Sequence, residues 1–263
     1  MKIKFTTLLI LIFFCCKNSL HSQNGFTDKS EAKNEMKNGL KEGKWMEYLN
    51  AEFRDTTKKA GTFYSLVIYK EGKRVETERI YDPNGKLQIE TPYSGGKKNG
   101  IQKEYYESGM VFSEKPFVND TITGIKKVFH ENGKLFQESP YIGNLINGTG
   151  KQFYESGKTE GEIIFVNGKK NGLSKQYYEN GTLSTEIPYV NDKREGIVRN
   201  YFENGKISGE ITVKNDVRTG VELSYYKNGK LEYQVNCVNG KQNGLLKGYY
   251  ESGHLQQETT YTD

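Results

Sequence analysis

Hydrophobic residues recur along this chain in short runs of about six to eight residues, and turn residues separate the runs at two alternating kinds of site. One kind ends in Glu-Asn-Gly or Glu-Ser-Gly, and the other begins with Val-Asn-Asp or Val-Asn-Gly. The runs contain Tyr, Phe, Ile and Val rather than strong helix formers. This pattern predicts β-strands that are joined by hairpins, with no helical segment of any length to cover them.

The turn glycines keep a constant spacing of 24 residues along the chain. Those of the first kind of turn are Gly85, Gly109, Gly133, Gly157, Gly181, Gly205, Gly229 and Gly253. A second series is Gly100, Gly124, Gly148, Gly172, Gly196, Gly220 and Gly244. An unbroken period of this length is typical of stacked supersecondary units. We therefore predict an all-β fold, a single-layer antiparallel repeat sheet of β-hairpins that curves into an open trough.

The first kind of turn suggests a register for each hairpin. Asn180-Gly181 and Asn204-Gly205 suit the two loop residues of a type I′ turn, because both positions need positive φ. This register places opposite charges on facing residues, which favours one alignment over its neighbours. The predicted pairs are Lys103 with Glu114, Lys127 with Glu138, Lys151 with Glu162, Lys175 with Glu186, Arg199 with Glu210 and Lys247 with Glu258. The odd unit pairs two uncharged residues, Leu223 and Gln234.

The same register predicts a stripe of aromatic residues on each face of the sheet. It pairs Tyr106 with Val111 and Tyr178 with Leu183, and the residue before each of these tyrosines points to the opposite face. Because no second layer covers the sheet, these rings form the candidate binding surface. One stripe contains Tyr106, Tyr154, Tyr178, Phe202, Tyr226 and Tyr250, and the other contains Tyr105, Tyr177 and Tyr201. The alternative is that each ring has a structural role and packs on the sheet in place of a second layer.

The N-terminus differs from the rest of the chain. Lys2 and Lys4 precede an apolar run of 12 residues, which is too short to span a bilayer as a helix and predicts a signal peptide over 1–22. Cleavage after Ser22 fits this pattern, and lipoprotein cleavage before Cys16 is the alternative. The domain prediction continues with a polar lead-in at 23–42, frayed or disordered, and a repeat domain at 43–263 with an irregular insertion at about 50–63.

Composition and net charge limit the classes of partner that this protein can bind. Only 34% of the residues are hydrophobic while 13% are aromatic, which suits a thin sheet better than a thick core. Loss of Lys2, Lys4 and Lys17 with the leader lowers the formal net charge from +5 to +2. That balance gives little attraction to nucleic acid, so we predict no nucleic-acid partner. Outside the leader Cys237 is the single cysteine, which predicts no intrachain disulfide and no zinc cluster.

The residues offer little chemistry for catalysis. His130 and His254 each stand alone at a repeat position that is otherwise aromatic or Lys. The recurring glutamates each face a predicted basic residue, so a pair of carboxylates for acid and base work is not formed. The turns at 95–100 and 167–172 resemble phosphate-binding loops only faintly, because no helix follows them. We predict a protein that is not an enzyme and has no metal site and no cofactor.

Units such as 165–187 resemble the MORN repeat, in the bacterial variant of the YwqK-like antitoxin family. The matching residues are Phe165, Asn167 to Lys169, Gly172, Tyr177, Tyr178, Glu179, Asn180 and Gly181. The resemblance covers about 64–263 and reaches Gly43 in weaker form. It implies a repeat scaffold that binds proteins or lies near membranes, and an antitoxin role. The family's tryptophan is present only as Trp45, and elsewhere Ile101, Ile125, Leu173, Ile197, Val221 and Leu245 lie near its place.

Three functions from different classes fit these features. The leading one is an exported scaffold that binds a protein partner through aromatic faces or sheet edges, with an antitoxin or immunity protein as its alternative form. The second is binding of carbohydrate or cell envelope by tyrosine rings. The third is association with a membrane surface, which depends on a lipid anchor at Cys16. The predicted location is the periplasm, the outside of the cell or the outer membrane, and it is cytoplasmic only if the leader stays uncleaved.

The leader prediction can be tested by measuring the intact mass of the protein purified from its native cell. We expect a chain that begins at Gln23, or at a lipidated Cys16 if the lipoprotein alternative holds. A mass that includes Met1 and the whole leader would refute export and return the protein to the cytoplasm.

Overall fold

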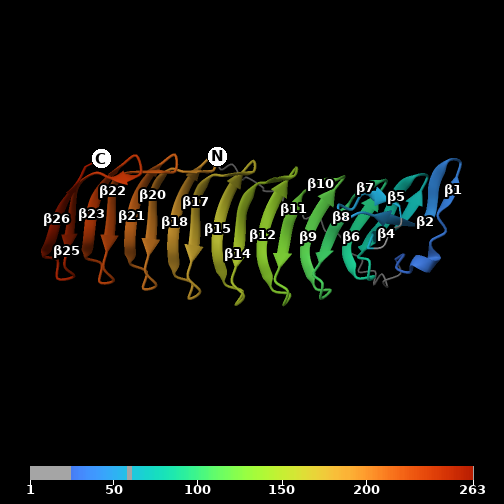
Figure 1. Cartoon of the computed structure of the whole chain (residues 1–263), viewed down its shortest axis with the longest axis horizontal. Helices are drawn as coiled ribbons and strands as arrows, with labels where there is room; N and C mark the ends of the chain where they lie inside the picture. Colours follow the sequence, from blue (N-terminus) through green and yellow to red (C-terminus); the bar gives the residue numbers. More distant parts are fainter. Residues whose placement is uncertain (1–24, 58–60, 263) are drawn as a thin grey trace, which may run out of the picture.

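The strands of the computed structural model, which describes residues 25–57 and 61–262, lie side by side in chain order as one elongated antiparallel sheet (Figure 1). Each strand pairs with strands that are close to it in the sequence. The one helical turn among the described residues is the 3-10 helix η1 (Lys29–Glu31). The predicted all-β, single-layer repeat sheet is therefore confirmed.

Most strands have six or more residues, and several have only two. From Lys97 onward, each two-residue strand is separated by one residue from the longer strand that follows it. The first strands are β1 (Glu35–Lys37), β2 (Leu40–Leu49), β3 (Asp55–Thr56), β4 (Phe63–Lys70), β5 (Lys73–Tyr81), β6 (Leu87–Ser94), β7 (Lys97–Lys98), β8 (Gly100–Tyr105), β9 (Val111–Val118), β10 (Thr121–Ile122), β11 (Gly124–Phe129), β12 (Leu135–Ile142) and β13 (Leu145–Ile146). The others are β14 (Gly148–Phe153), β15 (Thr159–Val166), β16 (Lys169–Lys170), β17 (Gly172–Tyr177), β18 (Leu183–Val190), β19 (Lys193–Arg194), β20 (Gly196–Tyr201), β21 (Ile207–Lys214), β22 (Val217–Tyr225), β23 (Leu231–Val238), β24 (Lys241–Gln242), β25 (Gly244–Tyr249) and β26 (Leu255–Tyr261).

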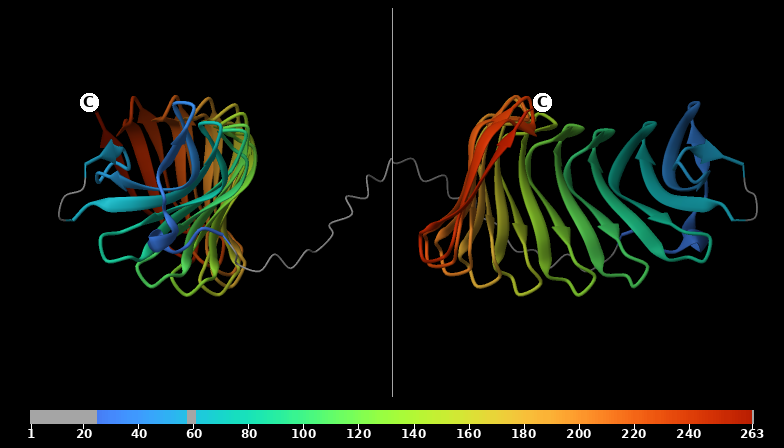
Figure 2. Two further views of the ribbon diagram at one scale, coloured as in Figure 1. Left: turned by 90° about the vertical axis from the view of Figure 1, so that its right-hand side faces the viewer. Right: turned by 60° about the vertical axis from the view of Figure 1, so that its left-hand side comes forward.

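The sheet twists and curves into a trough, which the end-on view of Figure 2 shows. We call the face that carries Gln102, Ser174 and Glu222 the inner face, and the face that carries Lys103 and Glu114 the outer face. All three inner residues are buried although no second layer lies over them. Such crowding is expected on the inside of a curved sheet, where side chains from neighbouring strands converge.

The predicted charge register is confirmed in every hairpin. Lys103 faces Glu114, the five other opposite-charge pairs face each other in the same way, and Leu223 faces Gln234. Neighbouring hairpins extend the row, because Glu90 also faces Lys103 and Lys127 also faces Glu114. The outer face therefore carries one ladder of alternating charges. Its closest ion pairs include Arg199 with Glu210, whose Nε–Oε1 distance is 2.8 Å.

The turns at the glycines of the first series differ from the predicted type. Gly109 N–H donates to the Tyr106 carbonyl, Tyr106 N–H donates to the Met110 carbonyl, and both distances are 2.9 Å. The loop thus has three residues, of which Gly109 has the positive φ of 84°. This is the three-residue hairpin closed by a G1 bulge. The type I′ assignment of Asn180 and Asn204 is wrong, since neither has a positive φ.

A second bulge corrects the register that the three-residue loop shifts. It lies between Glu104 and Tyr105, so that Tyr105 faces Val111 while Lys103 still faces Glu114. The predicted pairing of Tyr106 with Val111 is therefore wrong by one residue. The same shift pairs Phe129 with Leu135, Phe153 with Thr159, Tyr177 with Leu183, Tyr201 with Ile207, Tyr225 with Leu231 and Tyr249 with Leu255.

Type I′ geometry occurs at the opposite end of the strands. Val118 faces Thr121 across a two-residue loop in which Asn119 and Asp120 have φ of 49° and 68°. The second loop residue also binds the preceding hairpin: Asp120 N–H donates to the Lys98 carbonyl, and its Oδ1 accepts from Lys98 N–H at 2.8 Å. These contacts explain why Asn and Asp are used here, since both tolerate positive φ and offer a side-chain acceptor.

The N-terminal edge of the sheet is covered by the lead-in. Strand β1 pairs with the start of β2, and β3 pairs with its end. Between them the Asn34 side chain accepts from Met46 N–H (2.9 Å) and donates to the Met46 carbonyl (3.2 Å), as a neighbouring strand would. Phe26 is buried, with its carbonyl accepting from Arg79. The backbone groups of an edge strand invite pairing with other chains, and here they are already occupied.

The lead-in and the insertion both contain short elements of secondary structure. The described part of the lead-in contains a 3-10 turn and a short strand. The insertion predicted at about 50–63 is the connection between β2 and β4, and it contains β3. The predicted signal peptide and its two cleavage sites lie outside the described residues.

The turn assignment predicts different effects for two neighbouring alanine substitutions. Gly109→Ala should lower the free energy of unfolding by about 1–2 kcal/mol, because open space surrounds the glycine but a side chain at positive φ is strained. Ser108→Ala is the matched control, and we expect a change below about 0.5 kcal/mol. Urea denaturation measures both. Equal losses in the two variants would contradict the three-residue loop.

Candidate functional site

In four of the adjacent aromatic pairs, the first residue is a tyrosine that binds the preceding repeat on the outer face. The Tyr201 hydroxyl donates to Glu186 at 2.8 Å, and the Tyr105 hydroxyl donates to Glu90 at 2.5 Å. Tyr177 and Tyr225 contact Glu162 and Glu210 in the same way at longer distances. Burial and the bond to Glu186 raise the pKa of Tyr201 to about 12, so this hydroxyl keeps its proton. Four glutamates of the charge ladder, Glu90, Glu162, Glu186 and Glu210, thus accept from a tyrosine as well.

The second aromatic residue of each pair binds the following repeat instead. The Tyr178 hydroxyl donates to the backbone carbonyl of Tyr201 at 2.7 Å. The same bond joins Tyr106 to Phe129, Tyr154 to Tyr177 and Tyr226 to Tyr249, at 2.6–2.7 Å. Three positions lack it: His130, whose buried Nε2 has no hydrogen-bond partner, Phe202, and the exposed Tyr250.

These contacts show what most of the predicted surface residues do within the fold. Tyr106, Tyr154, Tyr178 and Tyr226 are half-buried and use their hydroxyls to hold the next hairpin, while Tyr105, Tyr177 and Tyr201 hold the previous one. The structure therefore brings the predicted residues together as two rows. Their polar groups are largely occupied by the chain itself, which leaves ring edges rather than hydroxyls for a partner.

A row of aliphatic side chains that the sequence analysis did not select lies exposed on the outer face. Ile125, which is 53% exposed, faces Pro140, and the register repeats this in Ile101 with Pro116 and Leu173 with Pro188. A parallel row at the strand ends includes Ile142, which is 63% exposed. We call these residues the outer band: Ile101, Val118, Ile125, Ile142, Ile164, Val166, Leu173, Val190, Ile197, Val221, Val238 and Leu245. The signal in the sequence was the aliphatic residue after every second-series glycine except Gly148, which Thr149 follows.

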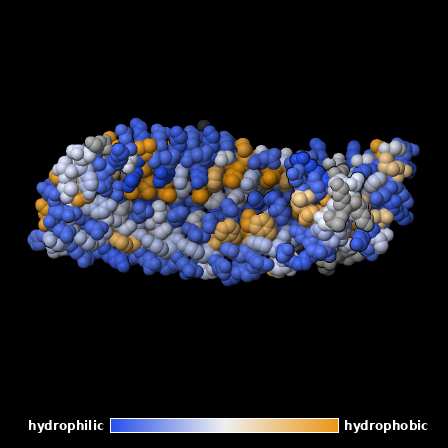
Figure 3. Space-filling view, in the orientation of Figure 1, coloured by the Kyte–Doolittle hydropathy of each residue, from blue (hydrophilic) through white to orange (hydrophobic). Residues whose placement is uncertain are grey.

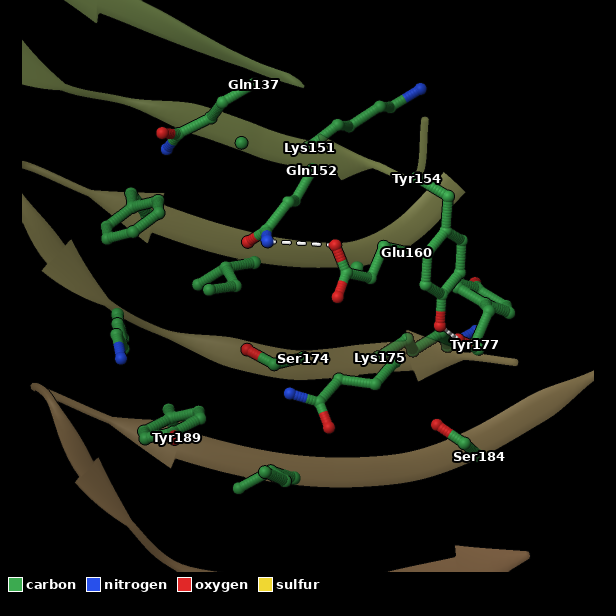
Figure 4. A pocket seen from close by; sticks show the side chains of 17 residues that line it. Gln137, Lys151, Gln152, Tyr154, Glu160, Ser174, Lys175, Tyr177, Ser184 and Tyr189 are labelled. Carbon is green, nitrogen blue, oxygen red and sulfur yellow. Dashed lines mark hydrogen bonds between the residues drawn. The ribbon is translucent and has the colours of Figure 1, made fainter. Parts of the chain in front are cut away.

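The hydropathy of the surface is uneven. On the face shown in Figure 3, apolar side chains gather in separate patches between hydrophilic ones. A hollow of about 360 Å³ lies on the inner face, where β14, β15, β17 and β18 meet. Gln137, Gln152, Ser174 and Tyr189 are among the side chains around it (Figure 4). The sequence analysis missed this hollow because it is formed where side chains are missing, at Gly150 and Gly161.

Buried acidic residues form a separate cluster near the N-terminal end of the inner face. Arg74 Nη1 donates to Glu78 at 3.2 Å, and Arg74 Nη2 lies 3.5 Å from Glu47. Burial raises the pKa of Glu78, although Arg74 opposes that effect. The Tyr69 hydroxyl donates to Glu47 at 3.0 Å. The two carboxylates are thus held by a shared arginine.

The sequence model of one family matches most of this periodic region. Its description is MORN repeat variant, and it matches eight segments, residues 77–94, 98–119, 122–142, 146–167, 170–191, 194–215, 218–239 and 242–263. Together these cover more than half of the chain. The chain belongs to the MORN repeat variant family. No curated protein matches it significantly.

Each complete MORN repeat corresponds to one hairpin and its link to the next. The repeat at 98–119 begins in β7, passes the turn at Gly109 and ends in the type I′ turn after β9. The bond of the second tyrosine crosses from one MORN repeat to the next, and the bond of the type I′ loop joins Lys98 at the start of a repeat to Asp120 directly after its end. Where both bonds are present, the strands are held at both of their ends.

Two further features are absent from the described residues. Their side chains contain no group of three or more His, Cys, Asp or Glu residues placed to hold a metal ion. None of their helices is long and apolar enough to cross a membrane. Cys237 is buried, and burial and the Glu222 carboxylate raise the pKa of its thiol.

The tyrosine bonds between MORN repeats can be tested by removing and adding one hydroxyl. Tyr178→Phe should lower the free energy of unfolding by about 1 kcal/mol, because the Tyr201 carbonyl loses its donor. Phe202→Tyr should raise it by a similar or smaller amount, since the new hydroxyl can reach the Tyr225 carbonyl. Tyr250→Phe is the control with no such bond. Equal free energies of unfolding for the three variants, measured by chemical denaturation, would contradict a stabilising role for this hydrogen bond.

Proposed function

We propose that this MORN repeat protein is a non-enzymatic binding scaffold, and that a protein partner docks on the outer band. The observation that supports it best is the repeated exposure of large aliphatic side chains on a face with no covering layer. Exposed apolar patches mark interaction sites in soluble proteins. Export of the scaffold rests on the leader sequence alone.

The outer band suits a protein partner better than the tyrosine rows do. Its side chains are exposed and have no hydrogen-bonding groups, whereas the tyrosine hydroxyls are engaged in holding neighbouring hairpins. The band also runs beside the charge ladder, so an apolar strip is flanked by alternating charges of both signs. Protein interfaces commonly combine an apolar centre with a polar rim.

A toxin is one form that this partner can take, and the scaffold would then be an antitoxin or an immunity protein. That assignment is carried by the resemblance to the antitoxin family rather than by a particular contact. It predicts that the partner captured on the outer band inhibits growth when it is expressed alone.

The docking proposal can be tested by site-specific photocrosslinking in the native cell. A photoreactive residue at Ile125 or Ile197 should give one discrete crosslinked species, and one at Gln176 on the inner face should not. The double variant Ile142→Lys and Leu173→Lys should reduce the yield at Ile125 at least tenfold, because it places charges in the apolar strip. Gln152→Lys, which adds charge to the inner face, is the control.

Absence of a discrete species from both outer positions would refute docking on the outer band. Equal crosslinking from the two faces would do the same. Circular dichroism of the purified variants shows whether the sheet is retained.

A further inference from the structure

The inner-face hollow exists because two repeat positions carry glycine. In other repeats the position of Gly150 is occupied by Gln102, Lys126, Ser174, Val198, Glu222 and Leu246. The position of Gly161 is occupied by Ile89, Ser113, Gln137, Thr185, Tyr233 and Gln257, and by a second glycine at Gly209. Gly150 and Gly161 lie on paired strands and face the neighbouring residues Ile163 and Gln152. Both side chains are thus missing at one place, and the space is open.

The walls of the hollow are partly apolar. Phe165 lies close to the floor, since a Cβ on Gly150 would be 3.4 Å from its ring. Tyr189 occupies the same position in the next repeat, and the Lys170 ammonium lies 5.1 Å from the centroid of its ring. Ile163 and Ile187 complete this side. The aromatic and aliphatic surfaces suit the C–H groups of a ligand.

Neutral polar groups line the rest of the hollow. Ser174 is buried, and no hydrogen bond of its hydroxyl is found within the described residues. Gln176 is exposed there, and Gln152 donates to Glu160 at 2.9 Å (Figure 4). Amides and hydroxyls both donate and accept, so they match ligand groups that do the same. Three lysines and one glutamate line the hollow, but Lys151 and Lys175 face Glu162 and Glu186 in the outer-face ladder. Lys170 and Glu160 are thus the charged side chains of its inner side, and they leave no excess of charge there to select an ion.

We propose that this hollow binds a neutral sugar ring of a glycan. The hydroxyls of a pyranose donate and accept as the lining amides and Ser174 do, and its C–H face matches the aromatic and aliphatic wall. A volume of about 360 Å³ lies within the range of small-molecule sites, roughly 300–1,000 Å³. The hollow is on the face opposite to the outer band, so glycan binding there does not depend on the proposed protein docking.

An extended peptide fits the hollow less well. Peptides recognised by a sheet add as a strand at an open edge, where unpaired backbone groups are available. The strands around the hollow pair on both sides, β15 with β14 and β17, and β17 with β15 and β18. Their backbone therefore offers no edge. An amphipathic helix needs a mostly apolar groove, and this lining is about equally polar.

The test uses the purified chain on an array of neutral oligosaccharides built from glucose, galactose, mannose and N-acetylglucosamine, with random decapeptides printed on the same slide. We expect selective binding of one neutral glycan group, and isothermal titration calorimetry with the best oligosaccharide gives its affinity. Gly161→Thr places in the hollow the residue that Thr185 provides in the next repeat, and should weaken binding at least tenfold. A Cβ there would lie 3.5 Å from its nearest neighbour, so the sheet can accommodate it.

Ser174→Ala removes the free hydroxyl and should weaken the same affinity about fivefold, as expected for one hydrogen bond. Val198→Ala changes the equivalent position of the next repeat outside the hollow and should bind as the unaltered protein does. Circular dichroism checks folding, and Ser174→Ala alone decides the matter if Gly161→Thr does not fold. The proposal is overturned if no neutral glycan binds, if both hollow variants bind normally, or if peptides bind in place of glycans and lose binding in Gly161→Thr.

Discussion

The constant offset of 24 residues between neighbouring hairpins makes every row of side chains in this sheet a row of equivalent residues. The offset results from a three-residue loop and a compensating bulge at one end of the strands, and from a two-residue type I′ loop at the other. A change of one residue in any of these would move the charge ladder out of line and reverse the faces of the strand that follows. Register is therefore the condition on which all other contacts depend.

Contacts between neighbours replace the core that a single layer lacks. The second tyrosine donates forward to a backbone carbonyl, the first donates back to a glutamate, and the type I′ loop binds the hairpin before it. Each hydrogen bond contributes only about 1 kcal/mol, but bonds of these kinds recur along the array. Stability in such an array is close to a sum of repeat and neighbour terms, so local defects weaken it without abolishing it. His130 and Phe202 are tolerated losses of this kind.

The sequence was sufficient to predict the period, the strand runs, the single layer and the charge pairs, because each depends on spacing alone. The turns were misassigned because the loop and the bulge shift the register in opposite directions, so that Lys103 faces Glu114 under either description. Only the aromatic residues between the loop and the bulge distinguish them. The hydrogen bonds of Tyr178 and its equivalents were not foreseeable, since their acceptors are backbone carbonyls of the next repeat.

The two candidate surfaces differ in how they depart from the repeat. The outer band is regular, because an aliphatic residue recurs at the same position in most repeats. A partner can therefore contact aliphatic side chains at regular intervals along the sheet. The hollow is irregular, because Gly150 and Gly161 open a space at one place along the trough. In a repeat protein whose architecture explains every recurring residue, a site specific for one small ligand must come from positions that break the recurrence. Such exceptions are visible in the sequence once the repeats are aligned with one another, and they identify the hollow more directly than the tyrosines do.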